Sequence, residues 1–366
     1  MTNPAHWSGA DLAFMTRALA LTERGRDTST PNPSVGCVIV KDGRVVGEGW
    51  HERAGEPHAE IRALAAAGGQ AEGATVYTTL EPCSHTGRTG PCADALIAAK
   101  VARVVTALQD PSPRVNGQGL QRLRDAGIPV EVGLLEEEAR EAHRGFLARV
   151  TRGRPWLRVK AAASLDGRIA LANGASRWIT SEASREDVHR IRARSCAMLT
   201  GIGTVIADDP QLTVRKVPCK RQPRRVVIDN RLDMPLTAKI LAGDPPLILT
   251  VSDDAGKRAA LEARGVEVVR VAGEGKSDLA AVAKVLADRG FNEVTAETGG
   301  KLMGSLLAAG VVDEVLIYYA PMILGDKSQA MFVLPEWTNL EQALRPRIVE
   351  VRNIGPDIRV TARFAS

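Results

Sequence analysis

The sequence predicts an α/β protein of two domains. Its 366 residues are long for one domain, so two domains are the natural expectation. Strand-like and helix-like apolar periodicities alternate along nearly the whole chain, which is typical of layered α/β folds. The segment 143–156 carries four Arg, two Gly and a Pro, which marks a boundary between the two series of elements. We therefore expect domains at 1–150 and 151–366.

The first series of elements predicts one sheet covered by helices, an α/β/α domain. Asp42-Gly43 is a strong hairpin signal between two apolar runs, and Pro91 suits the first turn of a helix. The expected strands are 35–40, 44–50, 75–80, 103–108 and 129–132, and the expected helices are 10–25, 58–67, 91–100, 118–126 and 135–148.

The second series repeats the β/α pattern and ends in a hairpin. Thr180 or Ser181 is suited to cap the first helix of this series, and Gly355-Pro356 lies between the last two strands. We expect strands near 157–163, 196–200, 224–229, 246–251, 266–271, 293–297, 313–320, 346–352 and 357–364, with helices near 182–194, 254–264, 277–289 and 301–309.

Composition excludes several classes of function. Hydrophobic content of 44% with 25% charged residues is ordinary for a globular protein. A net charge of +5 and 4% aromatic residues are too little to argue for nucleic-acid binding. No apolar run approaches the ~18 residues of a membrane helix, and residues 1–9 lack the features of a signal peptide. Five irregularly placed Cys then indicate thiols or metal ligands, and we expect a cytoplasmic protein.

Three short motifs predict a catalytic zinc site: His58-Ala59-Glu60, Pro82-Cys83 and Pro91-Cys92. One His and two Cys supply three ligands to Zn²⁺ and leave the fourth position to water. Glu60 follows the His by two residues, where it can serve the water without binding the metal. This is the H-x-E…P-C-x-x-C arrangement of zinc-dependent nucleobase deaminases, except that eight residues separate the two Cys.

The expected chemistry of this site is hydrolytic deamination. We expect His58 and Cys92 each to open a helix, whose N–H groups favour a thiolate. Zinc lowers the pKa of its water to about 7, and Glu60 can take that proton and pass it to the leaving amine. One alternative is a structural zinc closed by His85, and another is a tRNA or nucleotide deaminase with an accessory domain. Cys37 and Cys196 lie in apolar strands and suggest core packing.

Two glycine pairs in the second half suggest phosphate binding. Gly201-x-Gly203 follows one expected strand, and Gly299-Gly300-Lys301 opens an expected helix. Glycine is also the default residue of tight turns, and no G-x-G-x-x-G stands in the required context. The residues alone therefore indicate only a phosphate- or dinucleotide-binding α/β domain.

The N-terminal motifs resemble one branch of the cytidine-deaminase-like superfamily, the pyrimidine deaminase of riboflavin biosynthesis. The resemblance covers 10–145 and rests on Asn32-Pro33-Ser34-Val35-Gly36, His58-Ala59-Glu60 and the segment from Glu81-Pro82-Cys83-Ser84-His85 through Gly87, Thr89 and Gly90 to Pro91-Cys92. The long loop between the two Cys is itself a mark of that branch. The resemblance implies that the Asn32 amide contacts the bound ring.

The C-terminal motifs resemble the reductase of the same pathway, whose fold is like that of dihydrofolate reductase. They are Ser164-Leu165-Asp166-Gly167-Arg168, the segment Ala207-Asp208-Asp209-Pro210 with Leu212, Thr213 and Arg215, and Glu297 with Gly299-Gly300. The order deaminase then reductase is that of the bifunctional bacterial family. It implies zinc-dependent deamination of 2,5-diamino-6-ribosylamino-pyrimidinone 5′-phosphate, then NADPH reduction of the ribosyl to a ribityl group, giving 5-amino-6-(5-phosphoribitylamino)uracil. It also implies a homo-oligomer, most simply a tetramer.

The resemblance implies residue roles in the reductase domain. Arg192 and Arg215 suit a substrate phosphate, because Arg gives bidentate, permanently charged contacts, and Lys160 can assist. Asp208 is either an orienting group or a turn residue, and Asn230 stands where the family often has Ser. The implied cofactor positions are Ala162, Trp178, Thr204, Asp208, Asn230, Gly299, Gly300, Lys301, Leu302, Met303, Gly304 and Ser305; the implied substrate positions are Ser176, Arg192, Leu212, Arg215 and Glu297.

Overall fold

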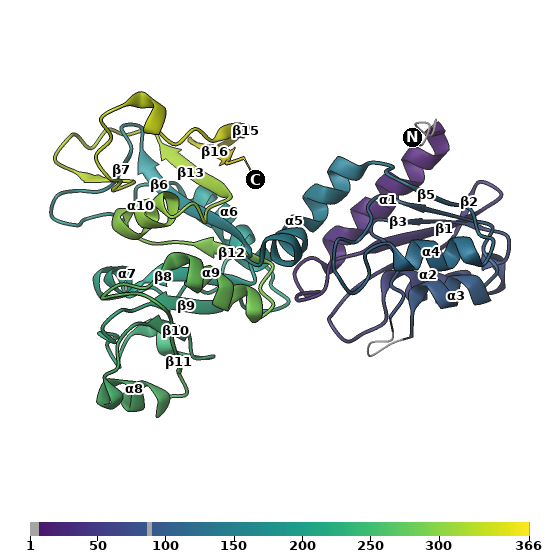
Figure 1. The fold of residues 1–366 in the computed structure, drawn as a ribbon. Coiled ribbons are helices and arrows are strands. Elements are labelled where there is room, and N and C mark those ends of the chain that lie inside the picture. The colour runs from purple at the N-terminus through teal and green to yellow at the C-terminus, as the bar shows by residue number, and fades with distance from the viewer. Residues whose placement is uncertain (1–6, 86–89, 366) are drawn as a thin grey trace. The chain divides into compact units, whose positions relative to one another are not determined.

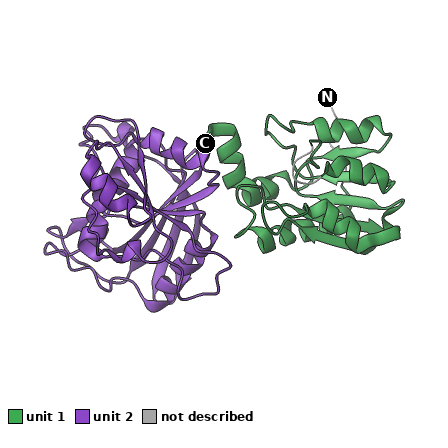
Figure 2. Ribbon diagram, turned by 90° about the horizontal axis from the view of Figure 1, so that it is seen from below, with its two compact units in different colours: residues 1–153 green, residues 154–366 purple. Residues whose placement is uncertain are grey.

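The chain forms two compact units, residues 1–153 and 154–366, in a computed structural model that describes residues 7–85 and 90–365 (Figure 2). Each unit contains its own sheet and its own clusters of buried apolar side chains. Within the described residues, no helix combines the length and the apolar character needed to cross a bilayer.

The first unit is a five-stranded sheet with the order β2-β1-β3-β4-β5. β1 pairs antiparallel with β2 and β3, whereas β3, β4 and β5 run parallel. Helices α1 and α5 lie on one face of this sheet, and α2, α3 and α4 lie on the other (Figure 1). The strands are β1 Gly36–Lys41, β2 Arg44–Trp50, β3 Thr75–Thr78, β4 Arg103–Thr106 and β5 Val130–Val132; the helices are α1 Gly9–Gly25, α2 Ala59–Ala67, α3 Cys92–Ala98, α4 Gln118–Asp125 and α5 Glu136–Arg152, with a 3₁₀ turn at Gly68–Ala71.

Local sequence explains how these elements begin and meet. Ser8 caps α1: its hydroxyl accepts from the Asp11 N–H at 3.0 Å, and the Asp11 carboxylate accepts from the Ser8 N–H at 3.0 Å. Asp42 and Gly43 both have positive φ, as a two-residue hairpin between β1 and β2 requires, so the predicted hairpin is confirmed. A Cβ on Gly36 would lie 2.0 Å from the Ala18 carbonyl oxygen, so α1 can pack on β1 only because residue 36 is glycine.

The second unit is built on a nine-stranded sheet with the order β11-β10-β9-β8-β12-β6-β13-β16-β15. Seven strands are parallel, and the C-terminal hairpin β15-β16 adds to the β13 edge in antiparallel fashion. The strands of this sheet are β6 Trp156–Ser164, β8 Ala197–Gly201, β9 Arg224–Ile228, β10 Leu247–Thr250, β11 Glu267–Arg270, β12 Glu293–Ala296, β13 Glu314–Ala320, β15 Arg347–Ile354 and β16 Asp357–Arg363; the helices are α6 Glu182–Arg194, α7 Ile202–Asp208, α8 Ala255–Glu262, α9 Leu279–Asp288 and α10 Gly300–Ala308.

Short elements were not predicted from periodicity. β7 Arg168–Ala170 and β14 Gln329–Ala330 pair with each other, but three and two residues are too few to display an alternating pattern. Helix α7 follows β8 directly and has only seven residues, so its apolar residues merge with those of the strand. Helix α5 continues to Arg152, beyond the expected end at 148, because its capping glycine is Gly153 in the left-handed conformation.

Candidate active sites

The three predicted metal ligands lie together in the first unit. His58 is the N-cap of α2, Cys83 follows β3, and Cys92 is the first residue of α3. The His58 Nδ1 atom lies 3.5 Å from Cys83 Sγ and 3.3 Å from Cys92 Sγ, and all three ligand atoms lie within 4.8 Å of one another. Zn–S bonds of about 2.3 Å and Zn–N bonds of about 2.0 Å place tetrahedral ligands roughly 3.3–3.8 Å apart. The donor set and its spacing therefore fit a zinc ion.

The ionisation of this cluster favours metal binding. Cys83 accepts hydrogen bonds from the thiol and the backbone N–H of Cys92, the latter at 3.4 Å, and from His58. These bonds hold the pKa of the Cys83 thiol well below its ordinary value, although burial opposes the shift. The site therefore favours the thiolate form of Cys83, which is the form that binds a metal.

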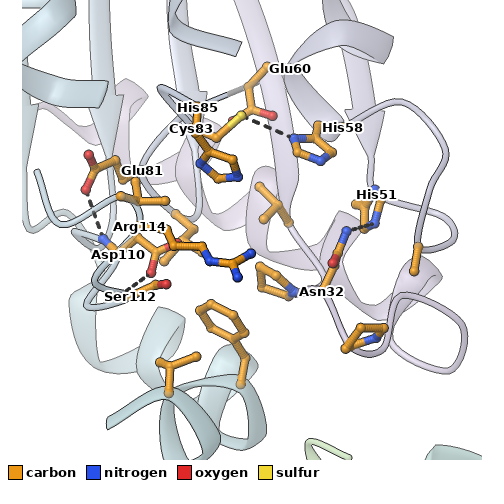
Figure 3. Close-up of a pocket in the computed structure, with 18 of the residues that line it drawn as sticks. Asn32, His51, His58, Glu60, Glu81, Cys83, His85, Asp110, Ser112 and Arg114 are labelled. Carbon is orange, nitrogen blue, oxygen red and sulfur yellow. Dashed lines mark hydrogen bonds between the residues drawn. The ribbon is translucent and has the colours of Figure 1, made fainter. Parts of the chain in front are cut away.

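Glu60 lies directly beside this cluster. It is the second residue of α2, its side chain is 3% exposed, and Figure 3 shows its carboxyl group next to the Cys83 sulfur. Burial raises the pKa of Glu60 to about 7, with a further contribution from the negative charge of Cys83. A carboxyl group with a pKa near neutrality can both accept and donate a proton, which suits a general base and acid.

A cavity of about 680 Å³ opens over the cluster. Its volume suits one small-molecule ligand. His58, Glu60 and Cys83 line it together with the predicted residue Asn32, and every lining residue belongs to the first unit. The remaining walls come from residues 31–35, 51–56, 80–85, 110–115 and 146–150.

Asn32 is oriented by His51, which the sequence did not indicate. The Asn32 Nδ2 atom lies 3.1 Å from His51 Nε2, and His51 Nδ1 lies 3.4 Å from the Pro57 carbonyl oxygen. Because the amide nitrogen can only donate, His51 Nε2 must accept and Nδ1 carries the proton. Burial and the neighbouring His58 lower the pKa of His51, which favours this neutral form. His51 follows β2 directly, and only the fold brings it to the cavity.

A loop after β4 supplies the opposite wall, and its residues were also missed. Asp110 accepts from the Ser112 N–H at 2.8 Å, and burial raises the pKa of Asp110 to about 6, helped by the charge of Glu81. Figure 3 shows the Arg114 side chain extending from this loop toward the side of the cavity formed by Asn32 and His51. β3 and β4 are parallel neighbours, so the residues that follow them meet at one sheet edge, and only the fold shows that these two strands are neighbours.

His85 lines the same cavity but does not join the metal-binding group. Within residues 7–85 and 90–365, that group consists of His58, Cys83 and Cys92. Three protein ligands leave a tetrahedral ion one open position, which is typical of catalytic rather than structural zinc. Gly87 and Thr89 of the predicted loop motif lie outside the described residues.

In the second unit, two of the predicted substrate residues, Arg192 and Glu297, are bonded to each other. Arg192 at the end of α6 donates to both carboxylate oxygens of Glu297, at 2.7 and 2.9 Å, and to the Thr213 carbonyl oxygen at 3.1 Å. Lys160 Nζ lies 3.9 Å from Glu297. Burial raises the pKa of Glu297, but the charges of Arg192 and Lys160 outweigh it and hold that pKa at about 2. Arg215 lies close by, since its N–H donates to His189 Nδ1, one turn from Arg192.

Several predicted cofactor residues meet where β8 and β12 end. The Thr204 hydroxyl accepts from the Gly299 N–H at 3.1 Å and lies 3.3 Å from the Thr298 hydroxyl. β8 and β12 are parallel neighbours, so these residues share one edge of the sheet. Ligands of open α/β sheets commonly bind at such an edge.

Packing alone explains the residue types at several positions of the 299–305 segment, without reference to a ligand. A Cβ on Gly300 or Gly304 would lie 2.4 and 1.8 Å from the carbonyl oxygens of Ala330 and Val333. Met303 belongs to the core of the second unit. Lys301 and Ser305 are exposed, and the Ser305 hydroxyl donates to the Lys301 carbonyl oxygen at 2.9 Å.

The other predicted positions are scattered over loops and strand ends. Leu212 is 4% exposed and packs in a core cluster, so only its backbone is available to a ligand. Asn230 accepts from the N–H and hydroxyl of Ser277, at 2.9 and 2.7 Å. The Asp208 carbonyl accepts from Arg177 at 2.6 Å. Trp178 is 67% exposed with Arg185 over its ring, and Ser176 and Ala162 are half-buried.

Two family profiles match the chain. Residues 8–108 match the cytidine and deoxycytidylate deaminase zinc-binding region, and residues 155–360 match the RibD C-terminal domain. The first match contains His58, Glu60, Cys83 and Cys92, and the second contains the predicted reductase residues.

Known proteins and solved structures are also similar to this chain over nearly its whole length. The riboflavin biosynthesis protein RibD of Escherichia coli is 46% identical over 360 residues, covering 95% of this chain and 98% of that protein. Its counterpart in Aquifex aeolicus is 41% identical over 349 residues, covering 95% and 97%. The structure of Acinetobacter baumannii RibD superposes with a TM-score of 0.90 at 42% identity, covering 98% and 99% of the two chains. A Thermotoga maritima structure, described as a diaminohydroxyphosphoribosylaminopyrimidine deaminase/5-amino-6-(5-phosphoribosylamino)uracil reductase, gives 0.86 at 33%, covering 97% and 98%.

Proposed function

This chain belongs to the RibD family of riboflavin biosynthesis proteins, and we propose that it performs the two successive reactions of that family. Residues 1–150 hydrolytically deaminate 2,5-diamino-6-ribosylamino-pyrimidinone 5′-phosphate. Residues 151–366 then reduce the ribosyl group of the product with NADPH, giving 5-amino-6-(5-phosphoribitylamino)uracil. The observation that carries the deaminase half is the His58, Cys83 and Cys92 cluster beside a buried Glu60 in a cavity of ligand size.

In the deaminase half, His58, Cys83 and Cys92 would hold the ion. Zinc bound there supplies Lewis-acid activation of a water molecule. Glu60 would accept a proton from the attacking water and deliver it to the departing amine, a role that its near-neutral pKa suits. Asn32, held by His51, presents its amide to the pyrimidine ring. Loss of ammonia completes the reaction.

In the reductase half, NADPH supplies the hydride, so the chain needs no nucleophile of its own. Arg215, Arg192 and Lys160 form a cationic group that suits the substrate phosphate, with Glu297 holding Arg192 in place. Thr204 and Gly299 stand at the sheet edge where a dinucleotide would bind. The positions Ala162, Trp178, Asp208, Asn230 and 300–305 for the cofactor, and Ser176 and Leu212 for the substrate, remain proposals that rest on the family motif.

The decisive experiment incubates the purified protein with the phosphorylated diaminopyrimidine, with and without NADPH. We expect ammonia release in both samples, and NADPH oxidation only once ammonia has been released. A zinc-loaded protein that releases no ammonia would contradict the deaminase assignment. Oxidation of NADPH without prior deamination would contradict the proposed order.

Two further properties belong to this proposal. The metal-binding thiols favour a reducing compartment, so we place the protein in the cytoplasm. We also propose a homo-oligomer, most simply a tetramer, as the family resemblance implies. Light scattering of the purified protein checks this, since a monomeric mass would contradict it.

A further inference from the structure

Glu81 is a buried acidic residue that has no role in the proposed zinc chemistry or in cofactor binding. Its side chain is 4% exposed, and it precedes the metal-binding motif Pro82-Cys83. Its backbone N–H donates to the Leu108 carbonyl oxygen at 2.9 Å, so it lies alongside the chain that leaves β4. Burying a carboxylate is costly unless hydrogen bonds compensate for the lost water.

Four backbone N–H groups provide that compensation. One carboxylate oxygen accepts from Asp110 at 3.1 Å and from Gly117 at 2.9 Å. The other accepts from Gly119 at 2.9 Å and from Leu120 at 3.4 Å. Figure 3 shows the bond from the Asp110 N–H to the Glu81 carboxylate among the residues that line the cavity. An ionised carboxylate matches this group of donors because both of its oxygens only accept.

These four donors mark the two ends of one cavity loop. Asp110 begins the segment that contributes Asp110, Ser112, Arg114 and Val115 to the cavity. Gly117 is the N-cap of α4 and has no side chain with which to cap it, and Gly119 and Leu120 lie in the first turn. Glu81 therefore supplies, from a different segment, the negative charge that a helix N-terminus prefers.

The same helix is seated on the chain that carries the metal ligands. A Cβ on Gly119 would lie 1.9 Å from the Pro82 carbonyl oxygen, so α4 makes backbone contact next to Cys83. Arg122 donates to the Ser84 carbonyl oxygen at 3.3 Å and pairs with Asp94, two residues after Cys92, at 2.5 Å. The loop and the metal cluster are thus fixed against each other through Glu81 and α4.

We propose that Glu81 is a positioning residue for deamination, which sets the distance between the metal cluster and the loop that receives the substrate. This inference rests on the proposed deaminase function. Glutamine would not replace Glu81, because its NH₂ group would face N–H donors and leave two of the four unpaired. The displaced loop would weaken substrate binding, whereas Glu60 and the ligand cluster would keep their places.

The test compares Glu81→Gln with wild type by steady-state ammonia release, zinc content and hydrogen exchange. We expect KM to rise about tenfold or more with kcat changed by less than about threefold, because the loop binds substrate without joining the proton transfers. Zinc stays bound, NADPH-dependent reduction of the deaminated product is unchanged, and the amides of residues 109–120 exchange faster. The matched control is Glu131→Gln, which removes a carboxylate that pairs with Arg103 outside the cavity. It should leave KM unchanged.

An unchanged KM in zinc-loaded Glu81→Gln, or loss of zinc from it, would overturn the positioning role. If that variant does not fold, Glu81→Asp tests the proposal instead. Its side chain keeps the charge but is too short to reach both Asp110 and Leu120. Its KM must therefore rise as well. Hydrogen exchange of the wild-type protein tests the proposal independently, because the amides of Asp110, Gly117 and Gly119 must exchange slowly. Absence of ammonia release from wild type would instead refute the proposed function, which separates the two failures.

Discussion

Glu60 shows at the scale of one residue how burial prepares a group for chemistry. Water would leave its carboxyl group ionised at neutral pH, but the interior beside Cys83 raises its pKa to about 7. The carboxyl group then exchanges its proton readily near neutrality. Its position, two residues after His58 at the start of α2, places it beside the ligand cluster without making it part of that cluster.

We therefore predict that Glu60→Gln lowers ammonia release by about 10²-fold to 10⁴-fold, because an amide cannot shuttle the proton. Zinc content and reduction of the deaminated product stay at wild-type levels, since Glu60 is not a ligand. Activity and metal analysis on the same preparation check both statements. Unchanged turnover with zinc bound would remove Glu60 from the mechanism.

Arg192 shows, at the same scale, how the shape of a side chain determines which contacts it can make. Two of its nitrogen atoms reach both oxygens of Glu297, and a third reaches the Thr213 carbonyl oxygen. A lysine has one compact charge and cannot make all three contacts. We predict that Arg192→Lys lowers the reductase kcat/KM by about tenfold or more and leaves ammonia release unchanged.

Arg190→Lys is the matched control for that prediction. Arg190 lies on the exposed side of the same helix and pairs with Glu186. The exposed pair contributes little, so this variant should match wild type in both reactions. Equal reductase losses in the two variants would show that α6 tolerates no lysine, and would contradict a specific role for Arg192.

At the scale of elements, the ends of strands and the beginnings of helices carry the site. His58 and Cys92 open α2 and α3, and Cys83 and the 110–115 loop follow β3 and β4. Because β3 and β4 are parallel, both segments leave the sheet at the same edge. Helix α5 covers the opposite face and buries His143, whose ring lies 3.1 Å from the Thr79 hydroxyl.

Burial of His143 predicts how α5 responds to acid. Burial, with a contribution from the charge of Arg26, lowers the pKa of His143 to about 4. The unfolded chain binds this proton below about pH 6.5, but the folded chain binds it only below about pH 4. Falling pH across that window therefore favours unfolding, by up to about 3 kcal/mol from this residue.

We expect acidification from neutral pH to the acidic end of this window to reduce the stability of His143→Gln less than that of wild type. The reason is that glutamine has no proton to take up. Thermal unfolding of the first unit at several pH values measures this difference. Glu137→Gln, on the exposed side of the same helix, should retain the wild-type acid sensitivity. The same acid sensitivity in His143→Gln would contradict the assignment.

The whole molecule consists of two units with separate cores and separate chemistry. The candidate metal site and its cavity lie entirely in the first unit, and the Arg192–Glu297 pair lies in the second. Chelation should therefore affect one activity alone.

We predict that removal of zinc with a chelator abolishes ammonia release but leaves NADPH-dependent reduction of the deaminated substrate unchanged. Added zinc restores ammonia release. Parallel assays on one preparation measure both effects. Loss of the reductase on chelation would show that the second activity depends on the metal, contrary to this assignment.

The sequence alone determined the family, the α/β class, the order of the longer elements and the candidate ligands. Those features are local: a hairpin glycine, a helix cap and a His-x-Glu motif act within a few residues of themselves. Only the tertiary structure placed His51, Asp110, Ser112 and Arg114 around the cavity, and paired Glu81 with amides up to 39 residues away. Contacts between distant segments depend on the order of the strands in the sheet. No short pattern in one sequence encodes that order.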